Sequence, residues 1–309
     1  MIYIKLEEIK DNKHDFFFSN ILDRIKKQIK KLKIDKIENI GINQPKTLIT
    51  INEISSMTLK KISKYINQNC VSLVCVSDNL LVNSKFLEFL KKEDVKIFDG
   101  RWLFEYLVGN IVDYVSICKK EKIESQEITI LTHSINRIVV STIKEIALKV
   151  RAINIITEKE NIFRKLEKEL YSEYGIILNM NNNYKRSLIK SDIIINFDYN
   201  EEDLNKYSLP KKACIINLQK EVKIDSKLFE GINSNYYEIT MPSKYIRSLI
   251  YLKGFNNQVL YESFIYKNTI PENIKEEIKQ DKVSICSLIG SNGKIRKKEF
   301  MNLSKKVIN

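Results

Sequence analysis

The amino-acid sequence predicts an α/β protein built from parallel strands that are covered by helices. Short apolar runs alternate with amphipathic helical segments along most of the chain, an order typical of parallel strands joined by right-handed crossovers. The runs are continuously apolar, as strands buried on both faces are. The 309 residues are 43% hydrophobic and contain only 8 Gly and 4 Pro. This composition excludes disordered, collagen-like and linker-rich chains, and the length favours two domains.

The N-terminal part, residues 1–120, is expected to be an α/β domain. Its predicted strands are three apolar runs: Thr47–Ile51, Val71–Val76 and Val95–Phe98. Helices are expected to begin at Ser56 and near Ser84, each with an apolar face. Arg101–Val108 is apolar nearly all round and is expected to be a buried helix. A polar stretch, Lys119–Gln126, then interrupts the hydrophobic pattern and predicts a domain boundary.

The second domain, residues 121–309, has its core at 127–240. Six apolar runs are its predicted strands: Glu127–Leu131, Ala152–Ile156, Ile176–Leu178, Asp192–Asn196, Ala213–Asn217 and Tyr236–Thr240. Helices are expected over Ile135–Val150 and Asn161–Tyr174, because their apolar residues recur with helical spacing. Gly175 is the expected stop of the second helix.

Shorter elements complete this domain. A short helix is expected to end at Ser187–Lys190. After Pro242 the pattern predicts three helices, and the last of them opens at Pro271, where proline suits a first helical turn. Val283–Ile289 is a late predicted strand, and the glycines that follow it predict a turn.

The net charge of +13 is concentrated near the two ends of the chain. Residues 21–36 hold seven basic and two acidic side chains, and residues 294–309 hold six basic and one acidic. The first segment is expected to form an amphipathic helix with a basic outer face. One interpretation is a contact surface for nucleic acid, an anionic membrane or an acidic partner. The other is an ordinary solvated helix face.

Cysteine usage and the N-terminus favour a cytoplasmic protein. The five cysteines are scattered, which predicts buried thiols, and with only His14 and His133 as histidines a zinc site is not expected. No apolar run approaches the length that spans a bilayer, and the N-terminus has no signal-peptide pattern.

The layout of residues 127–240 resembles a Rossmann domain, a doubly wound parallel sheet. The whole order, a first domain, this unit and then C-terminal helices, resembles the two-domain dehydrogenases of the shikimate dehydrogenase and glutamyl-tRNA reductase type. The stretch Ser191-Asp192-Ile193-Ile194-Ile195-Asn196 resembles the fourth strand of those families. The resemblance implies NAD or NADP as cofactor, bound between the domains.

The turn after the first strand departs from that family pattern. Rossmann domains bind pyrophosphate at a G-x-G-x-x-G turn, where backbone amides reach the phosphates. Here the turn, residues 131–137, reads Leu-Thr-His-Ser-Ile-Asn-Arg and holds no glycine. Either dinucleotide binding is lost, or Thr132, Ser134, Asn136 and Arg137 form a substitute phosphate cradle.

The other candidates lie where predicted strands end, because ligands of open parallel sheets bind beyond the carboxyl ends of the strands. Glu158 follows the second strand, where an acidic residue holds the adenine ribose and favours NAD; the alternative is an ordinary helix-start charge. Residues expected to hold a nucleotide are Thr132, Ser134, Asn136, Arg137, Thr157, Glu158 and Asn196. Further strand-end candidates are Ser77, Asp78, Asp99, Arg101, Asp198 and Asn217. His133 is either a general acid or base or a structural hydrogen-bond former.

Two functions follow from these patterns. The first is a Rossmann-like protein that binds a nucleotide or small molecule in the interdomain cleft, as an atypical NAD(P)-dependent oxidoreductase. The alternative is a non-catalytic Rossmann-like interaction protein that binds an acidic partner, such as nucleic acid, through segments 21–36 and 294–309. The glycine-free turn favours the second.

Overall fold

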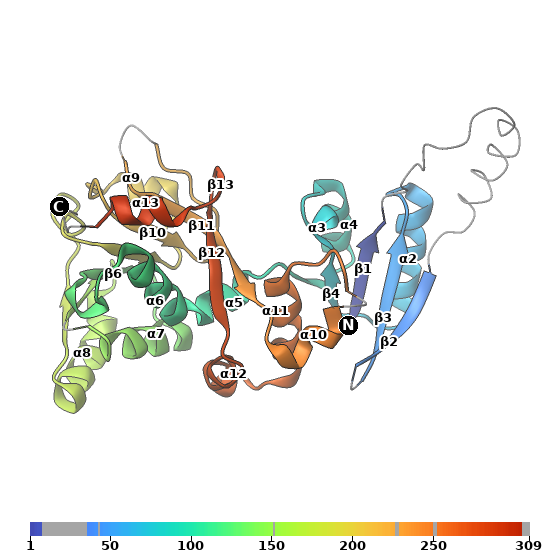
Figure 1. Ribbon diagram of the computed structural model, residues 1–309, viewed down its shortest axis with the longest axis horizontal. Helices are drawn as coiled ribbons and strands as arrows, with labels where there is room; N and C mark the ends of the chain where they lie inside the picture. Colours follow the sequence, from blue (N-terminus) through green and yellow to red (C-terminus); the bar gives the residue numbers. More distant parts are fainter. Residues whose placement is uncertain (8–35, 43, 151, 226–228, 250–251, 305–309) are drawn as a thin grey trace, which may run out of the picture. The chain divides into compact units, whose positions relative to one another are not determined.

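The computed structural model describes residues 1–7, 36–42, 44–150, 152–225, 229–249 and 252–304 (Figure 1). The basic helix expected within 21–36 lies outside the described residues, apart from Lys36. By packing, the chain forms two compact units. Unit 1 comprises Met1–Asp99 and Ser243–Lys267, and unit 2 comprises Gly100–Pro242 and Asn268–Asn309. The division of the chain into folding domains near residue 120 stays a prediction, and limited proteolysis is its direct test.

Unit 1 is built on a five-stranded sheet in the order β2-β3-β1-β4-β5. Its strands are β1 (Ile2–Leu6), β2 (Lys36–Ile42), β3 (Gln44–Ile51), β4 (Leu73–Val76) and β5 (Lys96–Phe98). Only the β2–β3 pair is antiparallel among these described strands. Strands β1 and β2 were not predicted. The short run of β1 lies apart from the βα alternation, yet it forms the centre of the sheet, with Tyr3 and Ile4 fully buried.

Helices cover the sheet of unit 1 and share its core. They are α2 (Ser56–Gln68), α3 (Asp78–Leu81), α4 (Ser84–Lys92), α10 (Ile246–Leu249) and α11 (Asn257–Asn268), with a 3₁₀ turn at Ser243–Tyr245. Ile62, Val74 and Phe86 belong to one buried cluster. The sequence pattern predicts Ser56 as the cap of the first helix, but the cap is Ser55, whose side chain accepts the N–H of Thr58. Helix α4 begins at Ser84, as predicted, and Asn83 is its cap.

Unit 2 contains an eight-stranded sheet in the order β13-β12-β11-β10-β9-β6-β7-β8. Its strands are β6 (Ile128–Leu131), β7 (Ala152–Ile156), β8 (Ile177–Met180), β9 (Ile193–Asn196), β10 (Cys214–Asn217), β11 (Ile232–Thr240), β12 (Ser284–Gly290) and β13 (Gly293–Lys294). The six strands β6 to β11 are parallel and follow the doubly wound Rossmann order. The predicted fold class is confirmed. Two antiparallel strands, β12 and β13, extend the sheet beyond β11.

Helices lie on both faces of this sheet (Figure 1). They are α5 (Arg101–Tyr106), α6 (Val108–Lys119), α7 (Arg137–Ala147), α8 (Glu160–Tyr174), α9 (Glu201–Asn205), α12 (Ile274–Gln280) and α13 (Lys297–Asn302), with 3₁₀ turns at Ile123–Ser125 and Pro271–Asn273. The chain steps one way from β6 to β8 and the other way from β9 to β11. Right-handed crossovers therefore place α7 and α8 on the face opposite α9.

In unit 2 the structure confirms the buried strands and the end of α8, and it corrects the expected short helix at Ser187–Lys190. All four residues of β6, β9 and β10 are buried, which explains their continuous apolar runs. Gly175 ends α8 with a φ of 67°. The short helix expected to end at Ser187–Lys190 is a series of turns instead, because Asn181 and Asn183 accept backbone amides two residues ahead. Helix α13 was not predicted; its Phe300 is fully buried.

The cysteine prediction holds for only part of the set. Cys75, Cys118 and Cys214 are buried thiols, but Cys70 and Cys286 are exposed. Cys70 lies in the turn after α2, and Cys286 alternates outward on β12. In the described ranges no group of three or more His, Cys, Asp or Glu side chains is placed to hold a metal ion. None of the described helices is long and apolar enough to cross a bilayer.

Candidate functional site

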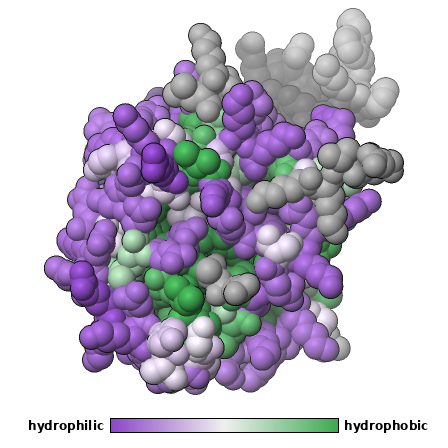
Figure 2. All heavy atoms as spheres, turned by 90° about the vertical axis from the view of Figure 1, so that its left-hand side faces the viewer, coloured by the Kyte–Doolittle hydropathy of each residue, from purple (hydrophilic) through white to green (hydrophobic). Residues whose placement is uncertain are grey.

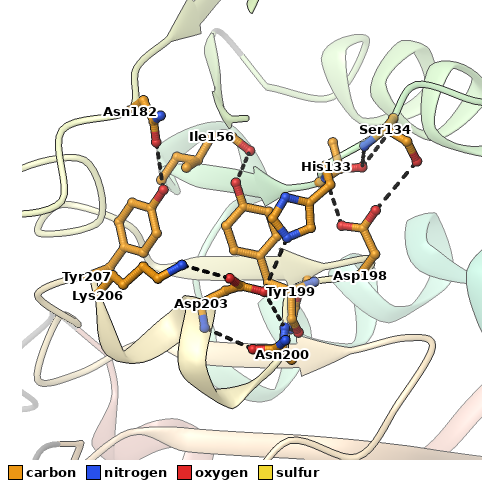
Figure 3. A network of polar contacts seen from close by, with 12 residues as sticks. His133, Ser134, Ile156, Asn182, Asp198, Tyr199, Asn200, Asp203, Lys206 and Tyr207 are labelled. Carbon is orange, nitrogen blue, oxygen red and sulfur yellow. Dashed lines mark hydrogen bonds and ion pairs between the residues drawn. The ribbon is translucent and has the colours of Figure 1, made fainter. Parts of the chain in front are cut away.

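The candidate site lies in unit 2, at the carboxyl ends of β6, β7 and β9 (Figure 3). Strands β6 and β9 are neighbours in the sheet but are separated in sequence by β7 and β8. The chain thus departs from this point in two directions, and the loops that follow β6 and β9 diverge onto opposite faces. Such switch points are where open α/β sheets bind their ligands.

The turn after β6 is occupied by a carboxylate of the protein itself. The backbone N–H of His133 donates to Asp198 Oδ1 at 2.8 Å, and Ser134 Oγ donates to Asp198 Oδ2 at 3.5 Å. Thr132 Oγ1 donates to the carbonyl of Ser134 at 2.7 Å and so braces the turn. Figure 3 shows Asp198 approaching this turn from the loop after β9. An internal anion therefore uses the amide that a bound phosphate would seek.

A backbone amide in the first turn of α7 is also hydrogen-bonded by a side chain of the protein. Asn136 is its N-cap, and Asn136 Oδ1 accepts the N–H of Val139 at 2.9 Å. Arg137 points away to an exposed ion pair with Glu272, with 68% of its side chain accessible. Neither side chain joins the cluster around Asp198, so their expected role in a phosphate cradle stays a prediction.

His133 lies at the centre of the cluster. Its ring stacks on Tyr199, with ring centroids 4.0 Å apart and an interplanar angle of 12°. His133 Nε2 lies 3.2 Å from Asp203 Oδ2, and Lys206 Nζ lies 3.1 Å from the other oxygen of the same carboxylate. Burial disfavours the charged form of Asp203. The backbone N–H of Asn200 and the two basic side chains outweigh that effect, so the pKa of Asp203 is lowered.

Tyrosines and an exposed carboxylate line the β7 side of the site. Burial raises the pKa of Tyr199, and Tyr207 and Glu158 raise it further. Tyr207 donates from its hydroxyl to Asn182 Oδ1 at 2.7 Å (Figure 3). Thr157 is buried, and its Oγ1 accepts the N–H of Lys159 at 3.1 Å. Glu158 follows β7, and its charge helps to raise the pKa of Tyr199; its expected role toward a ribose stays a prediction.

A row of asparagines runs from the carboxyl ends of β9 and β10 to Asn235 within β11. Asn196 Nδ2 donates to Asn217 Oδ1, and Asn217 Nδ2 donates to Asn235 Oδ1, both at 2.8 Å. Asn196 also closes the loop after β9, because its Oδ1 accepts the N–H of Tyr199 at 2.9 Å. Asn235 Nδ2 is buried and has no hydrogen-bond partner within the described residues. These side-chain amides link the carboxyl ends of β9 and β10 to β11.

Helix α5 places two charged side chains at the same edge. Arg101 Nη1 donates to the carbonyls of Asn217 and Leu218 at 3.4 Å, and also to that of Asn235. Burial raises the pKa of Glu105; its hydrogen bond with Gln219 opposes the rise, and the charge of Asp198 adds to it. The strand ends beyond β10 are therefore covered by an arginine from the chain itself.

The structure gathers part of the predicted set and adds residues to it. Thr132, Ser134 and Asn196 lie around the loop that carries Asp198, and Glu158 acts on its tyrosines. Tyr199, Asp203 and Glu105 were missed. Asn200 and Asp203 form a capping box at the start of α9, a pattern that the sequence does display. The ring stacking depends on the pairing of β6 with β9, which no local pattern reveals.

Comparisons with known proteins give only remote similarities of fold. No protein-family model matches the chain, and no curated protein matches it. Among solved structures, the chain is similar to dipicolinate synthase A chain from Bacillus subtilis, with 9% identity and a TM-score of 0.35 over 68% of this chain and 65% of that one. It is similar to L-tryptophan dehydrogenase from Nostoc punctiforme, with 9% identity and a TM-score of 0.31 over 91% and 79%.

A third similar structure belongs to another class of enzyme. It is a putative aspartate carbamoyltransferase from Leishmania major, with 9% identity and a TM-score of 0.29 over 70% of this chain and 71% of that one. The likeness to these proteins is remote and spans different activities. The Rossmann order described above stands on the strand pairing of this chain.

Proposed function

We propose that this chain is a non-catalytic Rossmann-like interaction protein that binds an acidic partner through its basic C-terminal segment, residues 294–309. The observation that carries the proposal is the hydrogen bond from the His133 amide to Asp198. It occupies the turn where a Rossmann domain would hold a pyrophosphate. The glycine-free sequence of the turn supports the same conclusion, because side chains hold a pyrophosphate away from the backbone.

Electrostatics at the turn also oppose a dinucleotide. A pyrophosphate there would face Asp198 and Asp203, with Glu158 nearby. Two like charges 4 Å apart repel by about 1 kcal/mol in water and about 4 kcal/mol in a protein surface environment. Arg101, a cation at this edge, donates to the backbone carbonyls of Asn217, Leu218 and Asn235. A phosphate group would therefore have to displace both a carboxylate and an arginine from their partners.

The basic C-terminal segment offers the opposite potential. Lys294, Arg296, Lys297 and Lys298 are exposed on β13 and the first turn of α13. Glu238 pairs with Lys294 at 2.8 Å, and Glu299 accepts the backbone N–H of Arg296. Such a cluster attracts polyanions with an affinity that falls as salt rises. With four cations in contact with phosphates, binding is expected to weaken on the order of 100-fold between 50 and 200 mM salt.

Fluorescence anisotropy with a labelled duplex DNA and a labelled poly-glutamate peptide tests this proposal. Both are probes of acidic partners, and titrations at several salt concentrations give the slope. The triple variant Lys294→Glu, Lys297→Glu, Lys298→Glu is expected to abolish binding. A matched control with the same charge change, Lys60→Glu, Lys61→Glu, Lys64→Glu on exposed positions of α2, is expected to retain it. Equal loss in both variants, or no binding of either probe at low salt, would contradict the proposal.

The second candidate is an atypical NAD(P)-dependent oxidoreductase of the two-domain dehydrogenase type. Glu158, at the carboxyl end of β7, favours it. Thermal unfolding with millimolar NAD, NADH, NADP and NADPH separates the candidates, since a ligand at 100 times its Kd adds about 2.7 kcal/mol of stability. We expect no shift with any of the four. A shift with NAD that is lost in Glu158→Ala would favour the oxidoreductase.

A further inference from the structure

Strand β8 differs from the other sheet edges of the described structure. The two sheets end in four edge strands: β2, β5, β8 and β13. Proteins commonly protect such edges with charged residues or proline, because an open edge can pair with another chain. Strand β2 contains Lys36 and Glu38, β5 contains Lys96 and β13 contains Lys294. Strand β8, with the sequence Ile-Leu-Asn-Met, contains neither a charge nor a proline.

The open side of β8 still has backbone groups to offer. The N–H of Asn181 donates to the carbonyl of Ile155 at 3.1 Å, and Asn179 is in register with Asn154 of β7. Successive residues of a strand direct their backbone groups to opposite sides. The N–H and C=O groups of Leu178 and Met180 are therefore directed away from β7, toward the edge of the sheet.

Strand β8 and the helix that precedes it, α8, both expose apolar or aromatic side chains. Ile177 is 54% exposed, and Ile162, Tyr171 and Tyr174 of α8 are exposed as well. Figure 2, which shows the left-hand side of Figure 1, has hydrophobic side chains at several places among the hydrophilic ones, the largest group in its lower half. Gathered exposed apolar side chains of this kind mark interaction surfaces.

The charge of the region around β8 indicates which kind of partner this edge can bind. Residues 158–190, which include α8 and β8, hold seven basic and five acidic side chains, and α8 alone holds three basic and four acidic. The terminal segments are strongly basic by contrast. A mixed, nearly neutral surface can face a copy of itself without net repulsion, whereas a copy meeting a basic segment would be repelled.

We propose that two copies of this chain associate edge to edge through β8, with the two β8 strands antiparallel about a twofold axis. The pairing would use the outward backbone groups of Leu178 and Met180 and would bury Ile177 of each copy. The interface is isologous, so each contact occurs twice. It is independent of the proposed binding of an acidic partner, since it uses neither basic segment.

Light scattering coupled to size exclusion, with the full chain loaded from about 1 to 100 μM, tests the proposal. We expect a concentration-dependent dimer. The variant Ile177→Lys places a charge at the edge and is expected to weaken the dimer at least tenfold. The matched control Ile246→Lys changes an isoleucine of unit 1 that is also 54% exposed, and it is expected to leave the dimer intact. A monomer at all concentrations, or equal behaviour of the two variants, would overturn the proposal.

Hydrogen exchange of the unaltered chain adds a readout that needs no variant. The amides of Leu178 and Met180 are expected to exchange more slowly at 100 μM than at 1 μM, while amides of β13, at the opposite edge of the same sheet, exchange equally at both concentrations. If slower exchange at high concentration appears on β13 and not on β8, the copies meet elsewhere and the proposal fails.

Discussion

An aspartate carboxylate accepts a backbone N–H at each end of strand β9, but the charged groups around the two bonds differ. Before the strand, Asp192 Oδ2 accepts the N–H of Glu127 at 3.0 Å; after it, Asp198 Oδ1 accepts the N–H of His133 at 2.8 Å. Asp192 is buried beside Lys119, whose fully buried ammonium lies 3.8 Å from it and 3.0 Å from Glu121. Asp198 instead lies near other carboxylates at the carboxyl ends of the strands.

The surroundings of the two bonds differ. The Asp192 bond lies in the interior at the amino ends of the strands, and the Asp198 bond lies at the carboxyl ends, where open α/β sheets bind ligands. At the amino ends the carboxylate is matched by a cation and shielded from water, as a stabilising buried network requires. At the carboxyl ends burial raises the pKa of Glu105, and the nearby charge of Asp198 adds to the rise. Carboxylates of the chain, each with partners from the chain itself, therefore occupy the position where Rossmann proteins bind anions.

The largest effect on the free energy of unfolding is expected from replacing Lys119, the buried cation beside Asp192 at the amino ends of the strands. Lys119→Met leaves Glu121 and Asp192 buried without their counter-ion, which should reduce the free energy of unfolding by about 3–5 kcal/mol. Urea denaturation followed by circular dichroism measures it. The exposed Lys122→Met serves as control and should change stability by less than about 0.5 kcal/mol. Equal effects would mean that Lys119 is not part of a buried network.

The two aspartates themselves give the next comparison. Asp192→Asn removes the charge that faces Lys119 and should cost about 1–3 kcal/mol. Asp198→Asn keeps an acceptor for the His133 amide and relieves repulsion at Glu105, so its effect should lie within about 0.5 kcal/mol of zero. Both are measured by the same urea titration. A larger loss for Asp198→Asn would show that the carboxyl end is the more tightly matched of the two.

The pH dependence of stability tests the burial of Glu105. Because the fold raises the pKa of Glu105, the native state binds its proton more tightly than the unfolded state, and this contribution is lost as the pH rises through the raised pKa. Glu105→Gln cannot ionise. Its stability relative to the unaltered chain should therefore increase between pH 4 and pH 7, by less than about 1 kcal/mol. A difference that stays constant over this range would contradict the raised pKa.

The smallest effect is expected at Arg137. Its ion pair with Glu272 is exposed on both sides, and such pairs contribute little. Arg137→Ala should change the free energy of unfolding by less than about 0.5 kcal/mol. If the same variant abolished a thermal shift with a nucleotide, Arg137 would instead belong to a phosphate site.

The fold was predictable from the sequence where burial is local and complete. Strands β6, β9 and β10 are buried at every position, so their residues form unbroken apolar runs. Strand β1 was missed because it precedes the βα alternation and finds its neighbours β3 and β4 more than forty residues away. The turns at 184–190 were mistaken for a helix end, since their asparagine-led hydrogen bonds leave no periodic pattern.

The candidate site was only partly predictable for a related reason. The position of Glu158 follows from the end of one strand, and the glycine-free turn is visible in the sequence. The contact between that turn and Asp198 joins residues 65 positions apart, and it requires β6 and β9 to be neighbours. Local patterns predict which residues stand at strand ends, whereas the strand order decides which of them meet.

The paired aspartates also constrain how the length of this region can vary. Glu127 and His133 are six positions apart along the chain, and so are Asp192 and Asp198. Both bonds form together only because the segments between them advance by the same number of residues in register. An apolar residue of β9 can be exchanged for another, but inserting or deleting one residue would separate an aspartate from its amide at one end. Homologous chains that retain both aspartates should therefore vary in the identity of these residues and not in their number.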